Sequence, residues 1–456
     1  MVFSPIPTSE LIQQDREHLI HPLYHPDEHE SPVIFAQGKG AILTDVDGHE
    51  YIDGLSCLWN VALGHGRTEL AEAGAQQLQT LAYASNYTGF SNIPAIQLAT
   101  ELMKVVYPNL RAVYFTSGGA ESNDSAFKTV RFFWKTQNKP DKVKIISRMW
   151  GYHGVTIGAM SATGIPSYHK NFAPMVPGHI HIPAPYYYRA NTTANWEEYG
   201  IEAANELEKA ILAEGADTVA AFIAEPVQGA GGVIPPPPTY FPRIREICDK
   251  YDVLFIADEV ITGFGRTGKM FALEHWGVQP DILSFAKAIT SGYLPLGGIV
   301  ISDRIHQAMM DVPVADKWMH AYTYSGHPTC CAVGLANLRI MIAEKLPERA
   351  AVMGERMLDG LKAFADHPMV GDVRGLGLMA AVELVKDKNT KESYPAAAKV
   401  ADRVAQEFRA RGLYTRARGD VIMLAPPLMI PEETLDKAVK IVGDTIDSVY
   451  NAVKSF

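Results

Sequence analysis

The sequence predicts an α/β protein built around a mostly parallel sheet that helices cover on both faces. Short runs in which nearly every residue is apolar alternate with helical stretches between residues 111 and 302. Such runs are typical of parallel strands buried between two helical layers. After residue 328 long helices and paired strands follow instead. This change of rhythm indicates a second, smaller α+β unit of roughly 125 residues, a normal size for a domain.

Six apolar runs are expected to form the strands of the large sheet. They are RAVYF (111–115), VKIIS (143–147), VAAFIAEP (219–226), VLFIADEV (253–260), ILSFAK (282–287) and GGIVIS (297–302). The stretch 196–214 repeats apolar residues at helical spacing and is followed by Gly215, which predicts a helix that ends there.

The two ends of the chain have shorter elements. Residues Thr8–His18 predict one helix capped by Thr8 or Ser9, and Gly38–Tyr51 predicts a hairpin that turns at Asp47-Gly48. C-terminal helices are expected near 329–344, 349–364 and 396–411 and from 431 onward, and strands near 369–374, 377–384 and 412–424. We therefore divide the chain into an N-terminal segment 1–67 that contributes to the small domain, a large domain 68–327 and a small domain 328–456.

The composition excludes several classes of function. The formal net charge is −10 and the isoelectric point near 5.8, whereas nucleic-acid binding requires a cationic surface. The first residues lack the basic flank and apolar core of a signal peptide, and no apolar run is long enough for a membrane span. Only four cysteines are present, with no C-x-x-C pair. We therefore expect a reduced, cytoplasmic protein without nucleic-acid or membrane partners.

Charged side chains close or follow three of the predicted strands. Glu225, Asp258 and Lys287 stand where apolar runs end, and the carboxyl ends of strands are where α/β sheets place their chemistry. A lone carboxylate there is more often paired with an arginine or caps a helix, and a lone lysine can reach the surface. Together, however, Asp258 can hold a protonated ring nitrogen and Lys287 can form a Schiff base.

A third motif can hold an anion. The string TSGGAESND (116–124) lies between the strand 111–115 and a helical stretch. Paired glycines at such a turn let backbone N–H groups converge on an anion at the positive end of the helix. An anion site, a carboxylate for a ring nitrogen and a lysine for an aldehyde together describe pyridoxal 5′-phosphate.

The chain resembles the class III aminotransferases of fold type I, in particular the branch that transfers amino groups from amines and ω-amino acids to pyruvate. The resemblance runs from about residue 20 to the C-terminus and depends on strings found in the order of the family. These strings are SGGAESND, GYHG, EPVQGAGGV, DEVITGFGRTG, SFAKAITSGYLPLGG, TYSGHP and RARGD. The family fold has a seven-stranded, mostly parallel sheet and a smaller α+β domain.

The resemblance assigns roles around the cofactor. Lys287 would carry pyridoxal 5′-phosphate as a Schiff base and move the substrate proton, and Asp258 would hold the pyridine N–H. Val260 and Tyr152 would pack on the two ring faces. The remaining cofactor positions are Gly119 and Ala120 for the phosphate, Gln228 near the ring hydroxyl, Glu225 in an orienting role and Thr323 for the phosphate of a neighbouring subunit. The family often has serine where this chain has Ala120, so one hydroxyl contact to the phosphate is missing.

The resemblance also implies a substrate pocket and an assembly. Arg416 would bind the carboxylate of the keto acid, with Arg418 as a competitor for that role. The pocket would be lined by Leu58, Trp59 and Ala230. The large apolar side chain of Trp59, considered without the resemblance, favours a position in the core instead. The shared phosphate site implies a homodimer, or a tetramer of two such dimers. The family preference is for S amines, and β-alanine, 4-aminobutyrate, putrescine-like diamines and aryl-alkyl amines all suit this branch as donors.

Other functions were weighed against this reading. Relatives of the fold act as aminomutases or decarboxylases, and the Arg416 motif favours transamination over them. A catalytically silent regulator of the same fold is disfavoured by Lys287, Asp258 and Tyr152, and a nicotinamide oxidoreductase by the lack of G-x-G-x-x-G after a strand. Four histidines at 18, 21, 25 and 29 have metal-like spacing, but Pro22 and Pro26 interrupt any helix that would align them, so no metal site is expected.

Overall fold

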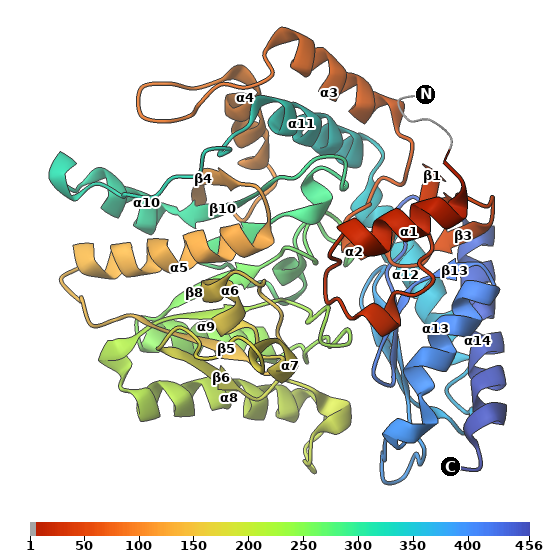
Figure 1. The fold of residues 1–456 in the computed structure, drawn as a ribbon. Coiled ribbons are helices and arrows are strands. Elements are labelled where there is room, and N and C mark those ends of the chain that lie inside the picture. Colours follow the sequence, from red (N-terminus) through yellow and green to blue (C-terminus); the bar gives the residue numbers. More distant parts are fainter. Residues whose placement is uncertain (1–5) are drawn as a thin grey trace.

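The computed structural model describes residues 6–456 and has an α/β core with a seven-stranded sheet (Figure 1). The strand order is β4-β10-β9-β8-β7-β5-β6, and β10 alone runs antiparallel to its neighbours. The predicted mostly parallel sheet is therefore confirmed. Its strands are β4 (Leu110–Thr116), β5 (Lys144–Arg148), β6 (His179–Ile182), β7 (Val219–Ala224), β8 (Leu254–Asp258), β9 (Ile282–Phe285) and β10 (Gly297–Ser302).

Successive residues of the central strands point into different cores, one on each face of the sheet. In β8, Phe255 packs with the core that includes α8 (Trp196–Glu214) and α9 (Tyr240–Lys250). The next residue, Ile256, packs with the core that includes α5 (Gly119–Thr136) and α10 (Asp303–Met310). This alternation is what the pleat of a strand imposes, and it explains why the strands are apolar on both faces.

Two smaller four-stranded sheets lie beside this core. One joins β1 (Phe35–Lys39), β2 (Ile42–Asp45), β3 (Glu50–Asp53) and β13 (Leu413–Tyr414) in that order. The other joins β11 (Val370–Gly375), β12 (Ala380–Leu384), β15 (Val421–Leu424) and β14 (Arg416–Arg418). The antiparallel pair of β2 and β3 confirms the predicted hairpin. The first sheet thus pairs N-terminal strands with a strand near the C-terminus, while the boundaries of the domains stay a prediction.

The remaining helices cover the sheets or connect them (Figure 1). They are α1 (Thr8–His18), α2 (Ser56–Trp59), α3 (Thr68–Thr80), α4 (Ile93–Leu102), α6 (Ile157–Ala162), α7 (Pro166–His169), α11 (Pro328–Ala343), α12 (Leu346–Lys362), α13 (Val400–Ala410) and α14 (Glu432–Val453). No helix within residues 6–456 is long and apolar enough to cross a membrane.

The first helix has the predicted bounds but not the predicted cap. Neither Thr8 nor Ser9 caps α1, because the N-cap position is held by Pro7 without a side-chain hydrogen bond. The Thr8 hydroxyl instead donates to Asp47 Oδ1 at 2.8 Å, in the turn of the hairpin. A long-range contact has therefore replaced the local cap. The sequence also missed β6, whose residues HIHI alternate polar and apolar side chains instead of forming an apolar run.

Candidate active site

A cavity of about 190 Å³ opens at the carboxyl ends of the central strands. Asp258 is the last residue of β8, and Lys287 follows the end of β9 by two residues. Helix α5 begins at Gly119 directly after β4 and supplies its first turn to the same cavity. The lining residues are Gly119, Ala120, Asn123, Tyr152, His153, Gly154, Val155, Glu225, Asp258, Val260, Ile261 and Lys287.

Lys287 is the basic group of this cavity. Burial lowers the pKa of its amine to about 8, while the carboxylates of Asp258 and Glu225 act in the opposite direction. Its backbone has φ +50°, a left-handed conformation that costs about 1–3 kcal/mol for a residue with a side chain. A lysine with a lowered pKa is a nucleophile at neutral pH, because an appreciable fraction of the amine is uncharged.

Asp258 is held by three hydrogen bonds that fix its carboxylate. Its Oδ2 accepts from the Asn123 amide at 2.8 Å and contacts His153 Nδ1 at 2.7 Å. Its Oδ1 accepts the backbone N–H of Val260 at 3.1 Å. The amide of Asn123 also donates to the backbone carbonyl of His153, which ties the two partners together. An ionised carboxylate that is buried and oriented in this way can bind a cationic ring N–H.

Glu225 organises the neighbouring backbone. Its Oε1 accepts the N–H of Tyr152 and its Oε2 the N–H of Gly229, both at 2.9 Å. Burial raises the pKa of this carboxyl group above its usual value, with a further contribution from Asp258. Burial likewise raises the pKa of Tyr152 to about 12, so its ring stays a neutral phenol. Glu225 therefore positions the residue that lines one side of the cavity.

The start of α5 forms the other side of the cavity. Gly119 lies so close to Val260 that a Cβ at that position would stand 2.8 Å from Val260 Cγ1. The N-cap position, Gly118, uses no side chain to satisfy the first N–H groups of the helix. Free N–H groups and the helix dipole at such an end favour an anion.

Seven of the predicted residues therefore meet in one cavity. They are Gly119, Ala120, Tyr152, Glu225, Asp258, Val260 and Lys287. The prediction missed His153 and Asn123 as partners of Asp258, although both belong to strings that carried the resemblance, GYHG and SGGAESND.

The other predicted residues do not line this cavity. Gln228 is buried nearby, donates to Met149 O at 2.9 Å and keeps its Oε1 without a partner among the described residues. Ala230 is half-buried, and Thr323 is exposed on a loop where its carbonyl accepts from Tyr83 Oη at 2.7 Å. Trp59 is buried in a cluster that includes Ile261 from the cavity, and Leu58 beside it is half exposed.

The two competing arginines differ in their surroundings. Arg418 lies over the ring of Trp150, 4.7 Å from its centroid, and donates to Gly231 O at 3.0 Å. Arg416 is exposed, and its charge opposes the rise in the pKa of Tyr152. Arg418 is thus committed to structural contacts, whereas Arg416 is exposed and acts on Tyr152 of the cavity through its charge.

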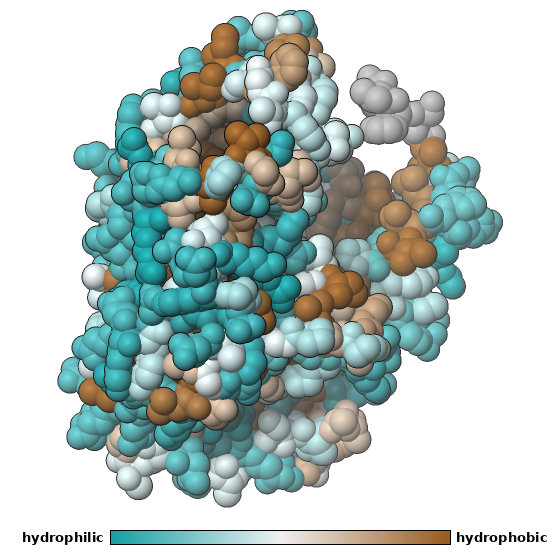
Figure 2. Space-filling model, turned by 90° about the vertical axis from the view of Figure 1, so that its left-hand side faces the viewer, coloured by the Kyte–Doolittle hydropathy of each residue, from teal (hydrophilic) through white to brown (hydrophobic). Residues whose placement is uncertain are grey.

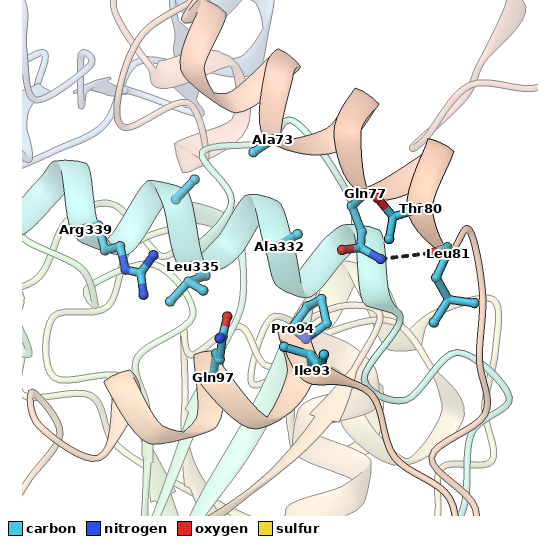
Figure 3. Close-up of a pocket in the computed structure, with 11 residues that line it drawn as sticks. Ala73, Gln77, Thr80, Leu81, Ile93, Pro94, Gln97, Ala332, Leu335 and Arg339 are labelled. Carbon is cyan, nitrogen blue, oxygen red and sulfur yellow. Dashed lines mark hydrogen bonds between the residues drawn. The ribbon is translucent and has the colours of Figure 1, made fainter.

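A larger hollow of about 340 Å³ lies between α3, α4 and α11 (Figure 3). Its lining is mostly apolar, and the polar groups in it are amides, the Thr80 hydroxyl and Arg339. In Figure 3 the Gln77 amide bonds the carbonyl of Leu81 at the end of its own helix. Because no carboxylate, histidine or lysine lines this hollow, it offers no acid–base or Schiff-base chemistry.

Comparison with known proteins gives concordant matches. A family model described as aminotransferase class-III matches residues 23–446. Putrescine–pyruvate aminotransferase of Pseudomonas aeruginosa is 40% identical over 422 residues, covering 92% of this chain and 91% of the relative. Gamma-aminobutyrate transaminase 1 of Oryza sativa subsp. indica, a mitochondrial protein, is 39% identical over 428 residues, covering 92% and 82%.

Two solved structures show the same architecture. An (S)-enantioselective omega-transaminase from Thermomicrobium roseum has a TM-score of 0.95 and 44% identity, covering 98% of this chain and 100% of its own. An omega transaminase from Pseudomonas jessenii, solved in complex with PMP, has a TM-score of 0.95 and 40% identity, covering 97% and 99%. Fold and sequence therefore agree along almost the whole chain.

Proposed function

This chain belongs to the class III aminotransferases, and we propose that it moves an amino group from an amine or ω-amino acid to a keto acid, with pyruvate as the expected acceptor. The single observation that carries the proposal is the cavity that contains both Lys287, a half-buried lysine of lowered pKa, and the fixed carboxylate of Asp258. Relatives with this donor chemistry include the putrescine–pyruvate and γ-aminobutyrate enzymes. 2-Oxoglutarate is the competing acceptor, because a diaminobutyrate–2-oxoglutarate transaminase of Halomonas elongata is also 39% identical to this chain.

Class III aminotransferases use pyridoxal 5′-phosphate, and the residues present fit this group. Lys287 would hold its aldehyde carbon, Asp258 its ring nitrogen and the first N–H groups of α5 its phosphate. Gln228 Oε1, which has no hydrogen-bond partner in the described part of the chain, is a buried acceptor that the ring hydroxyl could satisfy. When bound, the cofactor would take up the amino group and stabilise negative charge on the substrate carbon. The side chains of Tyr152 and Val260 would hold the ring between them.

The chain's own residues would then move the proton and select the acceptor. Lys287, once displaced by the substrate amine, is a base of suitable pKa to take the proton from the substrate carbon and return it. His153 and Asn123 keep the Asp258 carboxylate from turning away. Arg416 would bind the carboxylate of the keto acid in a two-pronged contact and leave the mouth open for uncharged amines. Leu58, Trp59 and Ala230 are proposed to shape the donor pocket.

We also propose that two copies share their sites. Apolar side chains of the α3–α4 region are strongly exposed in the single chain, among them Phe90 (73%) and Ile93 (70%). Figure 2 shows apolar side chains gathered in the upper part of the face at the left of Figure 1. Tyr83 from this region holds the backbone of Thr323. A second copy covering this surface would bring Thr323 to the phosphate of its neighbour.

The four free cysteines support a reducing, cytoplasmic location.

The test separates the two halves of the reaction. The holoenzyme is titrated with β-alanine, putrescine or (S)-1-phenylethylamine without keto acid, and its visible absorbance is followed. We expect the visible absorbance band of the lysine-bound cofactor to disappear with the true donor class. The same band should return on addition of pyruvate. Lys287→Ala should abolish both changes. Arg416→Ala should spare the first change with putrescine and (S)-1-phenylethylamine, which have no carboxylate, and should slow the return. A protein that takes up no pyridoxal 5′-phosphate, or that keeps its band with every donor, would refute the proposal.

A further inference from the structure

Helix α1 is attached to the rest of the protein in an unusual way. None of its residues is buried, and an isolated helix of 11 residues is marginal in water. Apolar packing therefore contributes little to holding it. Polar contacts are present at both ends instead. Thr8 bonds Asp47 at the first turn, and Asp15 in the last turn contacts two histidines that follow the helix.

The Asp15 carboxylate and these histidines form a compact cluster. One oxygen, Oδ2, lies 3.1 Å from His21 Nε2 and 2.9 Å from His29 Nε2. The two imidazole rings are 3.7 Å apart between centroids and tilted by 34°. All three ligating atoms lie within 4.8 Å of one another, and the side chains are only 17–23% exposed. Two imidazole nitrogens thus converge on one carboxylate at a site that is partly shielded from solvent.

A turn at Pro26 brings the members of the cluster together, although no helix in residues 6–456 aligns the histidines. Pro26 opens a short 3-10 turn, Pro26–Glu28, which directs the chain back so that His29 meets Asp15. The ligands therefore come from a helix end and from two points of the following loop. A continuous helix is not required to bring them together.

We propose that Asp15, His21 and His29 bind a divalent transition-metal ion of the zinc class. Zinc takes imidazole nitrogen and carboxylate oxygen at about 2.0–2.2 Å, usually with four ligands in a tetrahedron. Two such ligands around one ion are about 3.3 Å apart, by that geometry. The observed carboxylate–imidazole distances of 2.9 and 3.1 Å differ from this separation by only a few tenths of an ångström. Water would complete the coordination, and the ion would fasten α1 to the loop that follows it.

Two other clusters of ligand-type residues do not suit a metal as well. At Asp53, the carboxylate accepts the backbone N–H groups of Leu55 and Cys57, and burial raises the pKa of the Cys57 thiol to about 12. Both oxygens of the Asp53 carboxylate therefore already accept backbone N–H groups. At Asp45, the carboxylate is occupied by the N–H groups of Asp47 and His49 and by a tyrosine hydroxyl. Within residues 6–456, by contrast, the Asp15 oxygen is shared only by groups that can themselves be ligands.

The test uses the holoenzyme freed of metal with a chelator and then titrated with zinc chloride in a calorimeter. We expect one tightly bound zinc ion per chain and slower amide hydrogen exchange over residues 8–30. Loss of an outer partner of a ligand costs roughly 10–100-fold in affinity, so His29→Gln, which removes a ligand, should cost about 100-fold or more. His21→Gln should have the same effect.

Matched controls lie on the same segment. His25 is exposed outside the cluster, so His25→Gln should bind zinc like the unchanged protein. Cys57→Ser tests the Asp53 cluster and should also leave binding unchanged. The unfolding temperature without zinc shows that each variant is folded. Absence of tight binding in the unchanged protein, or binding that survives in His29→Gln, would overturn the proposal.

Discussion

Lys287 shows how burial prepares a single side chain for chemistry. Water stabilises an ammonium ion strongly, so its removal from water favours the neutral amine. The two carboxylates Asp258 and Glu225 counteract this effect and keep the pKa near 8 instead of lower. The amine is therefore balanced close to neutrality, where it can be nucleophile and base in turn.

The pH dependence of cofactor attachment should report this pKa. Only the uncharged amine attacks an aldehyde, so the rate of attachment to the apoprotein should rise about tenfold per pH unit below the pKa. It should level off above about pH 8. Stopped-flow absorbance measures this rate. In Asp258→Asn a stabilising charge is lost, so the plateau should begin at lower pH. A profile that still rises beyond pH 9.5, as for an exposed lysine, would contradict the assignment.

At the scale of elements, the site depends on the approach of a helix start to a strand end. Helix α5 begins beside Val260, which lies two residues after the end of β8, and Gly119 packs against this valine. The side chain of valine is β-branched and has one strongly preferred rotamer, so it cannot easily turn aside. Because position 119 is a glycine, the start of α5 can lie directly against Val260. The N–H groups of the helix and the valine proposed to pack on the cofactor ring therefore fit into one small cavity.

Two adjacent glycines provide a matched test of this approach. In Gly119→Ala the new Cβ would stand 2.8 and 3.0 Å from the two methyl groups of Val260. Overpacking of this kind costs about 1–3 kcal/mol and should weaken cofactor binding about tenfold or more. At Gly118 nothing lies within 4 Å of a new Cβ and the backbone is extended, so Gly118→Ala should change stability by less than about 0.5 kcal/mol. Cofactor titration and thermal unfolding measure both effects.

The double variant Gly119→Ala/Val260→Ala removes the clash and should recover part of the lost cofactor affinity. Equal losses in Gly118→Ala and Gly119→Ala would show that the spacing to Val260 is unimportant. Recovery in the double variant would in turn separate crowding from a general weakening of the helix start.

For the whole molecule, the exposed α3–α4 region predicts an assembly. A charge placed in an apolar contact is costly, because it loses water without gaining a partner. Ile93→Glu should therefore shift the protein from dimer to monomer, and activity should fall because Thr323 no longer reaches a partner. Leu212→Glu changes an equally apolar residue, 61% exposed on α8, and should leave the dimer intact. Light scattering coupled to size-exclusion chromatography gives the masses, and a dimeric Ile93→Glu protein would refute this surface.

The local elements and the ends of the strands could be predicted from the pattern of residues along the chain. Apolar runs located six of the seven strands, and helical periodicity gave both bounds of Trp196–Glu214. Asp258 and Lys287 could be predicted as site residues because a charged side chain at the end of a buried apolar run is costly unless it has a partner or a function. These properties depend on periodicity and burial, which neighbouring residues encode directly.

Contacts between residues that are distant in the sequence could not be predicted and depend on how the whole chain packs. His153 contacts Asp258 across 105 positions, and Asn123 does so across 135. Nothing in the sequence places Asp15 beside His29, yet a turn at Pro26 returns the chain so that the two side chains meet. Strand β6 was missed because its polar and apolar residues alternate, a pattern that is possible at the edge of the sheet, where β6 lies. The physical reason is common to these cases: periodicity reports which face of an element is buried, but the partner on that face is chosen by packing of the whole chain.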